Sequence, residues 1–200
     1  WAEWAMHVLP RTDEGGFQHI VIDLANDQQL WDDTLMMTVM PLAKIGLLLG
    51  RPAYVEEAKR QFMLHVKYLA DRATGLWFHG WTFDGRNHLS AALWARGNSW
   101  ITMAIPDFVE LLDLPEGDGL RAFLLATLEA QVAALRACQR ADGLWPTILD
   151  DPESYGEASA TAGIAYGVLK AVRLGLLPAD YLATGLRAAE AVIAHVDEQG

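Results

Sequence analysis

Three prolines at equal spacing constrain this chain more than any other feature. Pro52, Pro115 and Pro178 recur at intervals of 63 residues (52 to 115 and 115 to 178), and each follows a leucine-rich segment and precedes another helix-like one. Proline fits the first turn of a helix and cannot continue the preceding helix. The spacing therefore predicts a helical hairpin that occurs three times along the 200 residues.

A second marker has nearly the same period. A glycine turn followed by an aromatic residue occurs once in each unit, at intervals of 60 and 68 residues: Gly15-Gly16-Phe17, Gly75-Leu76-Trp77 and Gly143-Leu144-Trp145. Each unit then has an apolar helix with many small residues, a turn with proline and an amphipathic helix. The apolar helices are expected at 33–49, 98–112 and 158–174, and the amphipathic helices at 53–70, 120–140 and 181–196.

The composition of these helices predicts how they pack. The first helix of each pair is apolar on most faces and should be enclosed, whereas the second has a polar face that should meet solvent. The best strand candidate, 18–24, is short. Hairpins of this length exceed the roughly 20–50 residues of common solenoid repeats, and favour an all-α toroid, the (α/α)6 barrel. We expect residues 1–200 to form a single domain covering roughly three of its hairpins, truncated at both ends.

Charge and cysteine content exclude several functions. The chain has 26 acidic and 15 basic residues, a net charge of -11, which disfavours nucleic acid as a partner. Its one cysteine allows no internal disulfide and argues against a structural or catalytic zinc site. The longest apolar stretch is shorter than the ~20 residues of a membrane span, and no signal peptide is visible. We therefore expect a cytoplasmic protein without a metal, cofactor or membrane partner, and its oligomeric state stays open.

Two adjacent carboxylates precede the first apolar helix. Asp32 has an ordinary interpretation as a helix cap, because acidic residues are favoured at helix starts. Asp33 should lie on the same side of the helix as Met36 and Met37, three and four residues later. Burial among apolar groups raises a carboxyl pKa, which suits a general acid near neutral pH. Asp33 is therefore the candidate catalytic residue.

Aromatic residues gather in the loops before the second apolar helix. Trp77 and Trp81 flank His79 and are either a stacking surface for sugars or plugs in the core between helices. Further along, Arg96 lies between Trp94 and Trp100, before a Gly-Asn-Ser segment expected to be a turn with a helix cap. An arginine there is either a structural cation–π partner or a receptor for a carboxylate.

The third repeat has a weaker set of polar residues at the corresponding place. Tyr155, Glu157, Ser159 and Thr161 occur there, and a structural interpretation suits them as well as a functional one.

Several motifs together resemble those of the unsaturated rhamnogalacturonyl hydrolases of glycoside hydrolase family 105, with the unsaturated glucuronyl hydrolases of family 88 more distant. They run in family order through most of the chain: Gly15-Gly16-Phe17-Gln18-His19, Gln29-Leu30-Trp31-Asp32-Asp33-Thr34-Leu35-Met36-Met37, His79-Gly80-Trp81, Leu93-Trp94-Ala95-Arg96-Gly97-Asn98-Ser99-Trp100 and Glu157-Ala158-Ser159-Ala160-Thr161-Ala162.

The resemblance implies a chemistry as well as an (α/α)6 barrel. Such enzymes cleave the 4,5-unsaturated uronic acid at the non-reducing end of pectin or rhamnogalacturonan fragments, such as an unsaturated galacturonyl-rhamnose, by hydrating its enol ether. By motif position Asp33 would be the general acid and base. One acid is enough for this hydration, whereas ordinary glycosidases need two carboxylates at a fixed separation.

The resemblance also assigns the substrate-binding residues. The loop of Arg96 would hold the sugar carboxylate, and Trp94 and Trp100 would stack on the ring. His19 and His79 would bind sugar hydroxyl groups, and Trp31 would line the same site. The alternative is a non-catalytic helical toroid that binds glycans or protein through its aromatic loops.

Overall fold

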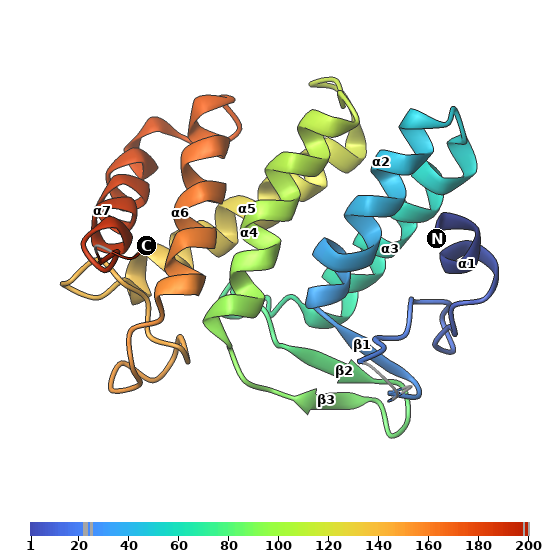
Figure 1. The fold of residues 1–200 in the computed structure, drawn as a ribbon, viewed down its shortest axis with the longest axis horizontal. Helices are drawn as coiled ribbons and strands as arrows, with labels where there is room; N and C mark the ends of the chain where they lie inside the picture. The colour runs from blue at the N-terminus through green and yellow to red at the C-terminus, as the bar shows by residue number, and fades with distance from the viewer. Residues whose placement is uncertain (22–23, 25, 198, 200) are drawn as a thin grey trace. The chain divides into compact units, whose positions relative to one another are not determined.

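The computed structural model describes residues 1–21, 24, 26–197 and 199, and it is mainly helical (Figure 1). It divides into two compact units, Trp1–Ala70 with Phe78–Ala91, and Asp71–Trp77 with Ala92–Gly200. The first unit contains α1 (Ala2–His7), β1 (Gln29–Trp31), η1 (Leu35–Val39), α2 (Met40–Leu48), α3 (Pro52–Leu69), β2 (Gly80–Thr82) and β3 (Asn87–Ser90). The second contains α4 (Ala95–Leu111), α5 (Gly119–Cys138), α6 (Ala158–Arg173), η2 (Ala179–Tyr181) and α7 (Leu182–Ile193).

The predicted hairpins are present. Helices α2 and α3 pack together in the first unit, and α4 with α5 and α6 with α7 in the second. Within the described ranges, no helix has the length and hydropathy needed to cross a membrane.

One predicted helix start was confirmed and one was wrong. The segment expected as one helix from residue 33 is helical from that residue, and the π-helical turn η1 precedes α2 within it. Helix α4 begins at Ala95 rather than at 98, because the extended backbone of Trp94 ends the preceding loop. Asn98 is consequently a buried residue inside the helix and not its cap.

The three glycine-aromatic loops pack in the same way in each repeat. All three aromatic rings are fully buried, as the largest side chains of the core should be. Each backbone N–H donates to a buried polar side chain of a helix: Phe17 to Gln61 (N···O 2.9 Å), Trp77 to Asn98 (2.9 Å) and Trp145 to Thr161 (3.1 Å). Trp77 is therefore a core plug, the second of the two interpretations that its sequence allowed.

The first glycine of each loop has a conformation that other residues rarely adopt. Its φ is 78° at Gly15, 87° at Gly75 and 89° at Gly143. A Cβ atom at Gly75 would lie 2.6 Å from the Ala130 carbonyl oxygen, and one at Gly143 would lie 2.7 Å from that of Arg187. The two loops of the second unit thus pass directly against the backbone of α5 and α7.

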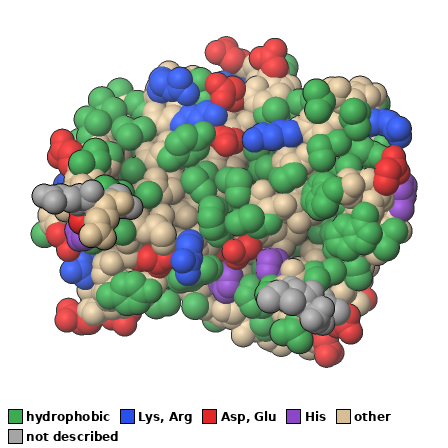
Figure 2. Space-filling model, viewed as in Figure 1, with side chains coloured by type: hydrophobic (Ala, Val, Ile, Leu, Met, Phe, Trp, Pro, Cys, Tyr) green, Lys and Arg blue, Asp and Glu red, His purple; other side chains and the backbone are tan. Residues whose placement is uncertain are grey.

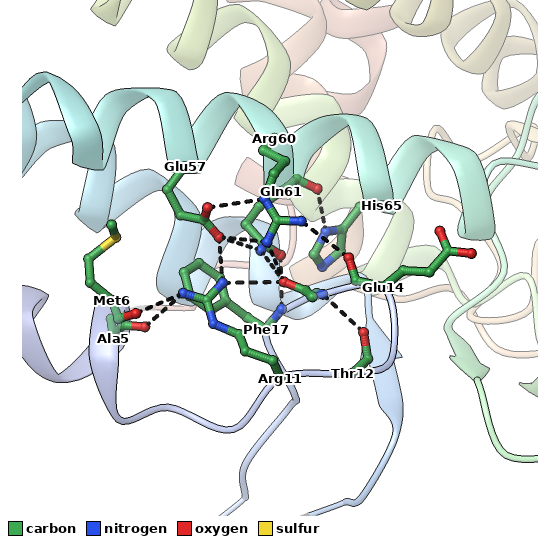
Figure 3. A network of polar contacts seen from close by, with 12 residues as sticks. Ala5, Met6, Arg11, Thr12, Glu14, Phe17, Glu57, Arg60, Gln61 and His65 are labelled. Carbon is green, nitrogen blue, oxygen red and sulfur yellow. Dashed lines mark hydrogen bonds and ion pairs between the residues drawn. The ribbon is translucent and has the colours of Figure 1, made fainter.

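A polar network holds the first of these loops on α3 (Figure 3). Glu57, only 14% exposed, pairs with Arg11 and with Arg60 (Oε2 to Nε 3.1 Å). Arg60 donates to the Gly15 carbonyl oxygen (2.6 Å), and Arg11 lies 4.0 Å from the centroid of the Phe17 ring. Part of the polar face of α3 therefore binds this loop and does not simply meet solvent, because the loop's backbone polar groups need partners.

A three-stranded antiparallel sheet was not predicted. Strands β1, β2 and β3 follow one another in that order, with Trp31 opposite Gly80 and Leu30 opposite Trp81. In the strand candidate 18–24, the described residues form an isolated bridge between Val21 and Leu24, and 22 and 23 lie outside the described residues. Strands of three or four residues are too short to show the alternation that identifies strands in sequence.

Close contact between α4 and α6 explains the small residues of the third apolar helix. A Cβ atom at Gly167 would lie 2.2 Å from the Thr102 carbonyl oxygen, and one at Gly163 would lie 2.9 Å from the Ser99 side chain. Helix α6 thus packs closely on α4 and α7, whereas Tyr166 on another side of it is 46% exposed, so the helix is only partly enclosed.

Apolar side chains also occupy much of the surface seen in Figure 2. On α7, Leu182, Leu186 and Ile193 are 42%, 47% and 69% exposed, whereas Ala188 and Ala191 are buried. Helix α7 thus packs on α6 through small residues and leaves its larger apolar residues at the surface.

Candidate active site

The small sheet brings the two adjacent aspartates to one histidine. β1 ends at Trp31, and Asp32 and Asp33 follow; β2 begins at Gly80, directly after His79. The Asp32 N–H donates to the His79 carbonyl oxygen (3.2 Å), which continues the antiparallel pairing. Residues 47 apart in sequence are therefore fixed side by side by backbone geometry.

The side chains of these three residues make a compact cluster. Asp32 Oδ1 lies 2.7 Å from His79 Nδ1, and Asp33 Oδ2 lies 3.6 Å from the same nitrogen. The Asp32 side chain is fully buried, whereas the Asp33 side chain is 21% exposed. Asp33 is therefore the carboxyl group that a ligand in solution can reach.

Burial raises the pKa of Asp32 well above its usual range. A hydrogen bond with the Asp33 side chain and the negative charge of Asp33 raise this pKa further. The Asp32 carboxyl group therefore favours its protonated, neutral form. The desolvated environment that the sequence assigned to Asp33 thus belongs to its neighbour Asp32.

Both nearby imidazoles favour the neutral form. Burial lowers the pKa of His79, against the opposing charge of Asp33. Burial also lowers the pKa of His19. To smaller extents, the charge of Asp33 raises this pKa and His79 lowers it. A neutral His79 with its proton on Nδ1 donates to Asp32 Oδ1 and leaves Nε2 free of a proton.

The Trp31 ring contacts the rings of both His19 and His79. It stacks on His19 (centroids 5.2 Å apart, 21° between planes) and meets His79 edge-on (4.6 Å, 84°). His19 Nδ1 also lies 3.0 Å from the Thr34 hydroxyl oxygen. The structure thus brings four residues singled out in the sequence into one cluster: His19, Trp31, Asp33 and His79.

A cavity of about 220 Å³ borders this cluster at His19 and Thr34. Its lining comes from α1, the following loop and the start of the first hairpin: Trp1, Trp4, Leu9, His19, Ile20, Thr34, Met37 and Thr38. Sequence analysis missed the two tryptophans. Their spacing of three residues places them on one side of α1, which was the available signal.

In the second unit, Arg96 has partners within the chain. Its guanidinium lies 4.5 Å from the centroid of the Trp94 ring, and its Nε lies 3.4 Å from Glu157 Oε1. Glu157 is buried and also accepts hydrogen bonds from the hydroxyl groups of Thr147 (2.7 Å) and Ser159 (2.8 Å). The Arg96 side chain is 43% exposed, so it remains partly accessible to solvent.

Glu157, for which the sequence left a structural and a functional interpretation open, thus holds the Arg96 side chain in place. Trp100, the remaining predicted binding residue, lies half-buried in the first turns of α4. That Trp94, Arg96 and Trp100 bind a substrate stays a prediction.

Asp32, Asp33 and His79 are also the described residues whose potential ligand atoms converge, all within 4.8 Å of one another. The expectation that no metal takes part stays a prediction.

Comparison with known proteins assigns the family. The sequence profile of Glycosyl Hydrolase Family 88 matches residues 1–200. The chain belongs to this family. It is 36% identical over 201 residues to the unsaturated rhamnogalacturonyl hydrolase YesR of Bacillus subtilis, an alignment that covers 100% of this chain and 56% of that protein.

Solved structures agree with the family and with the fold. A crystal structure from Klebsiella pneumoniae, described as a possible member of family GH105, is 60% identical with a TM-score of 0.99, and the match covers 100% of this chain and 52% of that one. A family 105 glycoside hydrolase from C. acetobutylicum is 31% identical with a TM-score of 0.86, over 98% of this chain and 57% of that one. The predicted α/α-toroid class is confirmed, and the chain spans about half the length of these relatives.

Proposed function

We propose that the protein acts in the hydrolysis of 4,5-unsaturated uronyl saccharides derived from rhamnogalacturonan or pectin. The single observation that supports this best is the cluster of Asp32, Asp33 and His79 beside Trp31, in a chain of a glycosyl hydrolase family. The name of the B. subtilis relative, unsaturated rhamnogalacturonyl hydrolase, favours an unsaturated galacturonyl-rhamnose among these substrates.

The proposed reaction uses Asp33 as acid and then as base. Protonated Asp33 gives its proton to C4 of the enol ether, and the developing positive charge lies on C5 and the ring oxygen. A water molecule adds to C5 and returns a proton to the Asp33 carboxylate. The resulting hemiketal opens to a 5-keto sugar and releases the rest of the saccharide, so one water is consumed and the acid is regenerated.

The exposure of the two carboxyl groups supports this choice of acid. Asp33 is 21% exposed and can exchange its proton with solvent and substrate, whereas Asp32 is enclosed. The imidazoles of His19 and His79 and the ring of Trp31 surround the acid and would bind sugar hydroxyl groups and ring faces. A cytoplasmic location remains part of this proposal.

Replacing Asp33 tests the function. Asp33→Asn should lower the rate at which an unsaturated galacturonyl-rhamnose loses its ultraviolet absorbance by at least ~10³-fold, because the variant has no proton to give to C4. Circular dichroism should show unchanged helical content. The control is Asp84→Asn, which makes the same change at an exposed carboxylate of the same unit and should keep the parent rate.

The competing function is a non-catalytic toroid that binds glycans or protein. That function would be supported if calorimetry detected saccharide binding to the parent and to Asp33→Asn alike while neither consumed the double bond. A parent rate retained in Asp33→Asn would show that another residue is the acid.

A further inference from the structure

We infer that Asp32 is a positioning residue that keeps its own proton throughout the reaction, accepts a hydrogen bond from His79 and donates one to Asp33. This inference rests on the proposed function and adds a residue to it. Its basis is the geometry of Asp32, which is the enclosed member of the carboxyl pair.

The first step of the argument is enclosure. The Asp32 side chain is fully buried, and no described residue donates a hydrogen bond to its Oδ2 atom. The backbone N–H groups of Asp32 and Asp33 lower the pKa of the carboxyl group, but by less than burial raises it. A carboxylate in such a place is costly, whereas a protonated carboxyl group is not. The neutral form also agrees with the raised pKa of this group.

The second step is the direction of each hydrogen bond, that is, which group donates and which accepts. Oδ1 faces His79 Nδ1 at 2.7 Å, and the Asp32 carboxyl group also has a hydrogen bond with the Asp33 side chain. A protonated carboxyl group has one acceptor oxygen and one donor hydroxyl. It can therefore accept from the imidazole and donate to Asp33 at the same time.

The third step is the effect of these two hydrogen bonds on His79 and on Asp33. The bond from Nδ1 selects one tautomer of His79 and leaves Nε2 as the hydrogen-bond acceptor that a sugar hydroxyl would meet. The bond to Asp33 stabilises the carboxylate that forms when Asp33 has delivered its proton. Among the described residues, Asp33 and His79 are the titratable groups that contact Asp32, and both of them affect the pKa of His19.

The matched pair of variants Asp32→Asn and Asp33→Asn in the full chain tests the inference. Asparagine reproduces a protonated aspartic acid, since its oxygen accepts and its amide group donates. Asp32→Asn should therefore lower kcat on an unsaturated galacturonyl-rhamnose by less than about 10-fold, with the pH profile of the parent. Asp33→Asn should lose at least ~10³-fold, although it is the same chemical change one residue away.

Asp32→Leu removes both hydrogen bonds at similar volume. It should lower kcat by about 10–100-fold, as expected when reacting groups are misplaced by about an ångström.

A spectroscopic measurement keeps the test independent of turnover. Nitrogen NMR of labelled histidine should show His79 protonated on Nδ1 in the parent and in Asp32→Asn, and a shift toward the Nε2 tautomer in Asp32→Leu. The inference is overturned if Asp32→Asn is as inactive as Asp33→Asn, or if the His79 tautomer is the same in all three proteins. If the parent itself shows no turnover, the proposed function fails and the tautomer measurement still decides the role of Asp32.

Discussion

At the scale of single residues, the site depends on two neighbours with different surroundings. Asp32 and Asp33 have the same side chain and follow the same strand, yet one is enclosed and the other reaches solvent. Burial, and not residue type, is the main reason that the pKa of Asp32 is raised. The same principle applies to the histidines, because burial lowers the pKa of His19, His65 and His79.

His65 provides a residue-scale prediction about stability. It is fully buried in α3, and burial lowers its pKa to about 4. The unfolded chain has the ordinary histidine pKa of about 6.5, so it binds a proton that the folded chain does not as pH falls from 6.5 to 4. His65 should therefore lower the free energy of unfolding by roughly 3 kcal/mol at pH 4, and contribute no pH dependence above 6.5.

Urea unfolding at pH 7, 5.5 and 4 checks this prediction. His65→Gln should lose less stability on acidification than the parent, by an amount that grows toward pH 4. The exposed His7 supplies the control, since His7→Gln should follow the parent curve closely. Parallel curves for His65→Gln and the parent would contradict the prediction.

At the scale of elements, short backbone segments place the functional side chains. β1 and β2 have three residues each, yet their register determines that Asp32 meets His79. The apolar helices α4 and α6 are held close by glycine, which leaves room for one backbone to pass directly against the other. A side chain in that space would have to move a whole helix.

Gly167→Ala tests this contact. The new Cβ would lie 2.2 Å from the Thr102 carbonyl oxygen, so α4 and α6 must separate, and we expect a loss of about 1–3 kcal/mol in the free energy of unfolding. Gly119→Ala is the matched control, because a Cβ there meets no atom within 4 Å. The control should be stabilised by about 0.4–1 kcal/mol in the same urea titration. Equal stability of the two variants would show that the helices adjust without cost.

At the scale of the whole molecule, net charge is the dominant property. A net charge of -11 on 200 residues makes like-charge repulsion a cost of the compact state. Surface ion pairs such as Lys67 with Glu14 offset little of it, because solvent and salt screen exposed pairs. Salt shortens the range of the repulsion from about 30 Å at 0.01 M to about 8 Å at 0.15 M.

Added salt should therefore stabilise the protein at pH 7. A gain of about 1 kcal/mol corresponds to a rise in Tm of about 2–4 °C for a chain of this size, measurable by calorimetry in 0.01 M and 0.15 M NaCl. The effect should disappear near pH 4.8, where the net charge is close to zero. A Tm that falls with salt at pH 7 would mean that attractive ion pairs outweigh the repulsion.

The sequence by itself determined the helical repeat, the family and the identity of the clustered residues. Proline and glycine spacing report local backbone geometry, which is why the hairpins and the three aromatic loops could be predicted. The tertiary structure alone decided the pairing of β1 with β2, the enclosure of Asp32 rather than Asp33, and the partnership of Arg96 with Glu157. These depend on contacts between residues 47 and 61 positions apart in the sequence, and on exclusion of water, which no local pattern records.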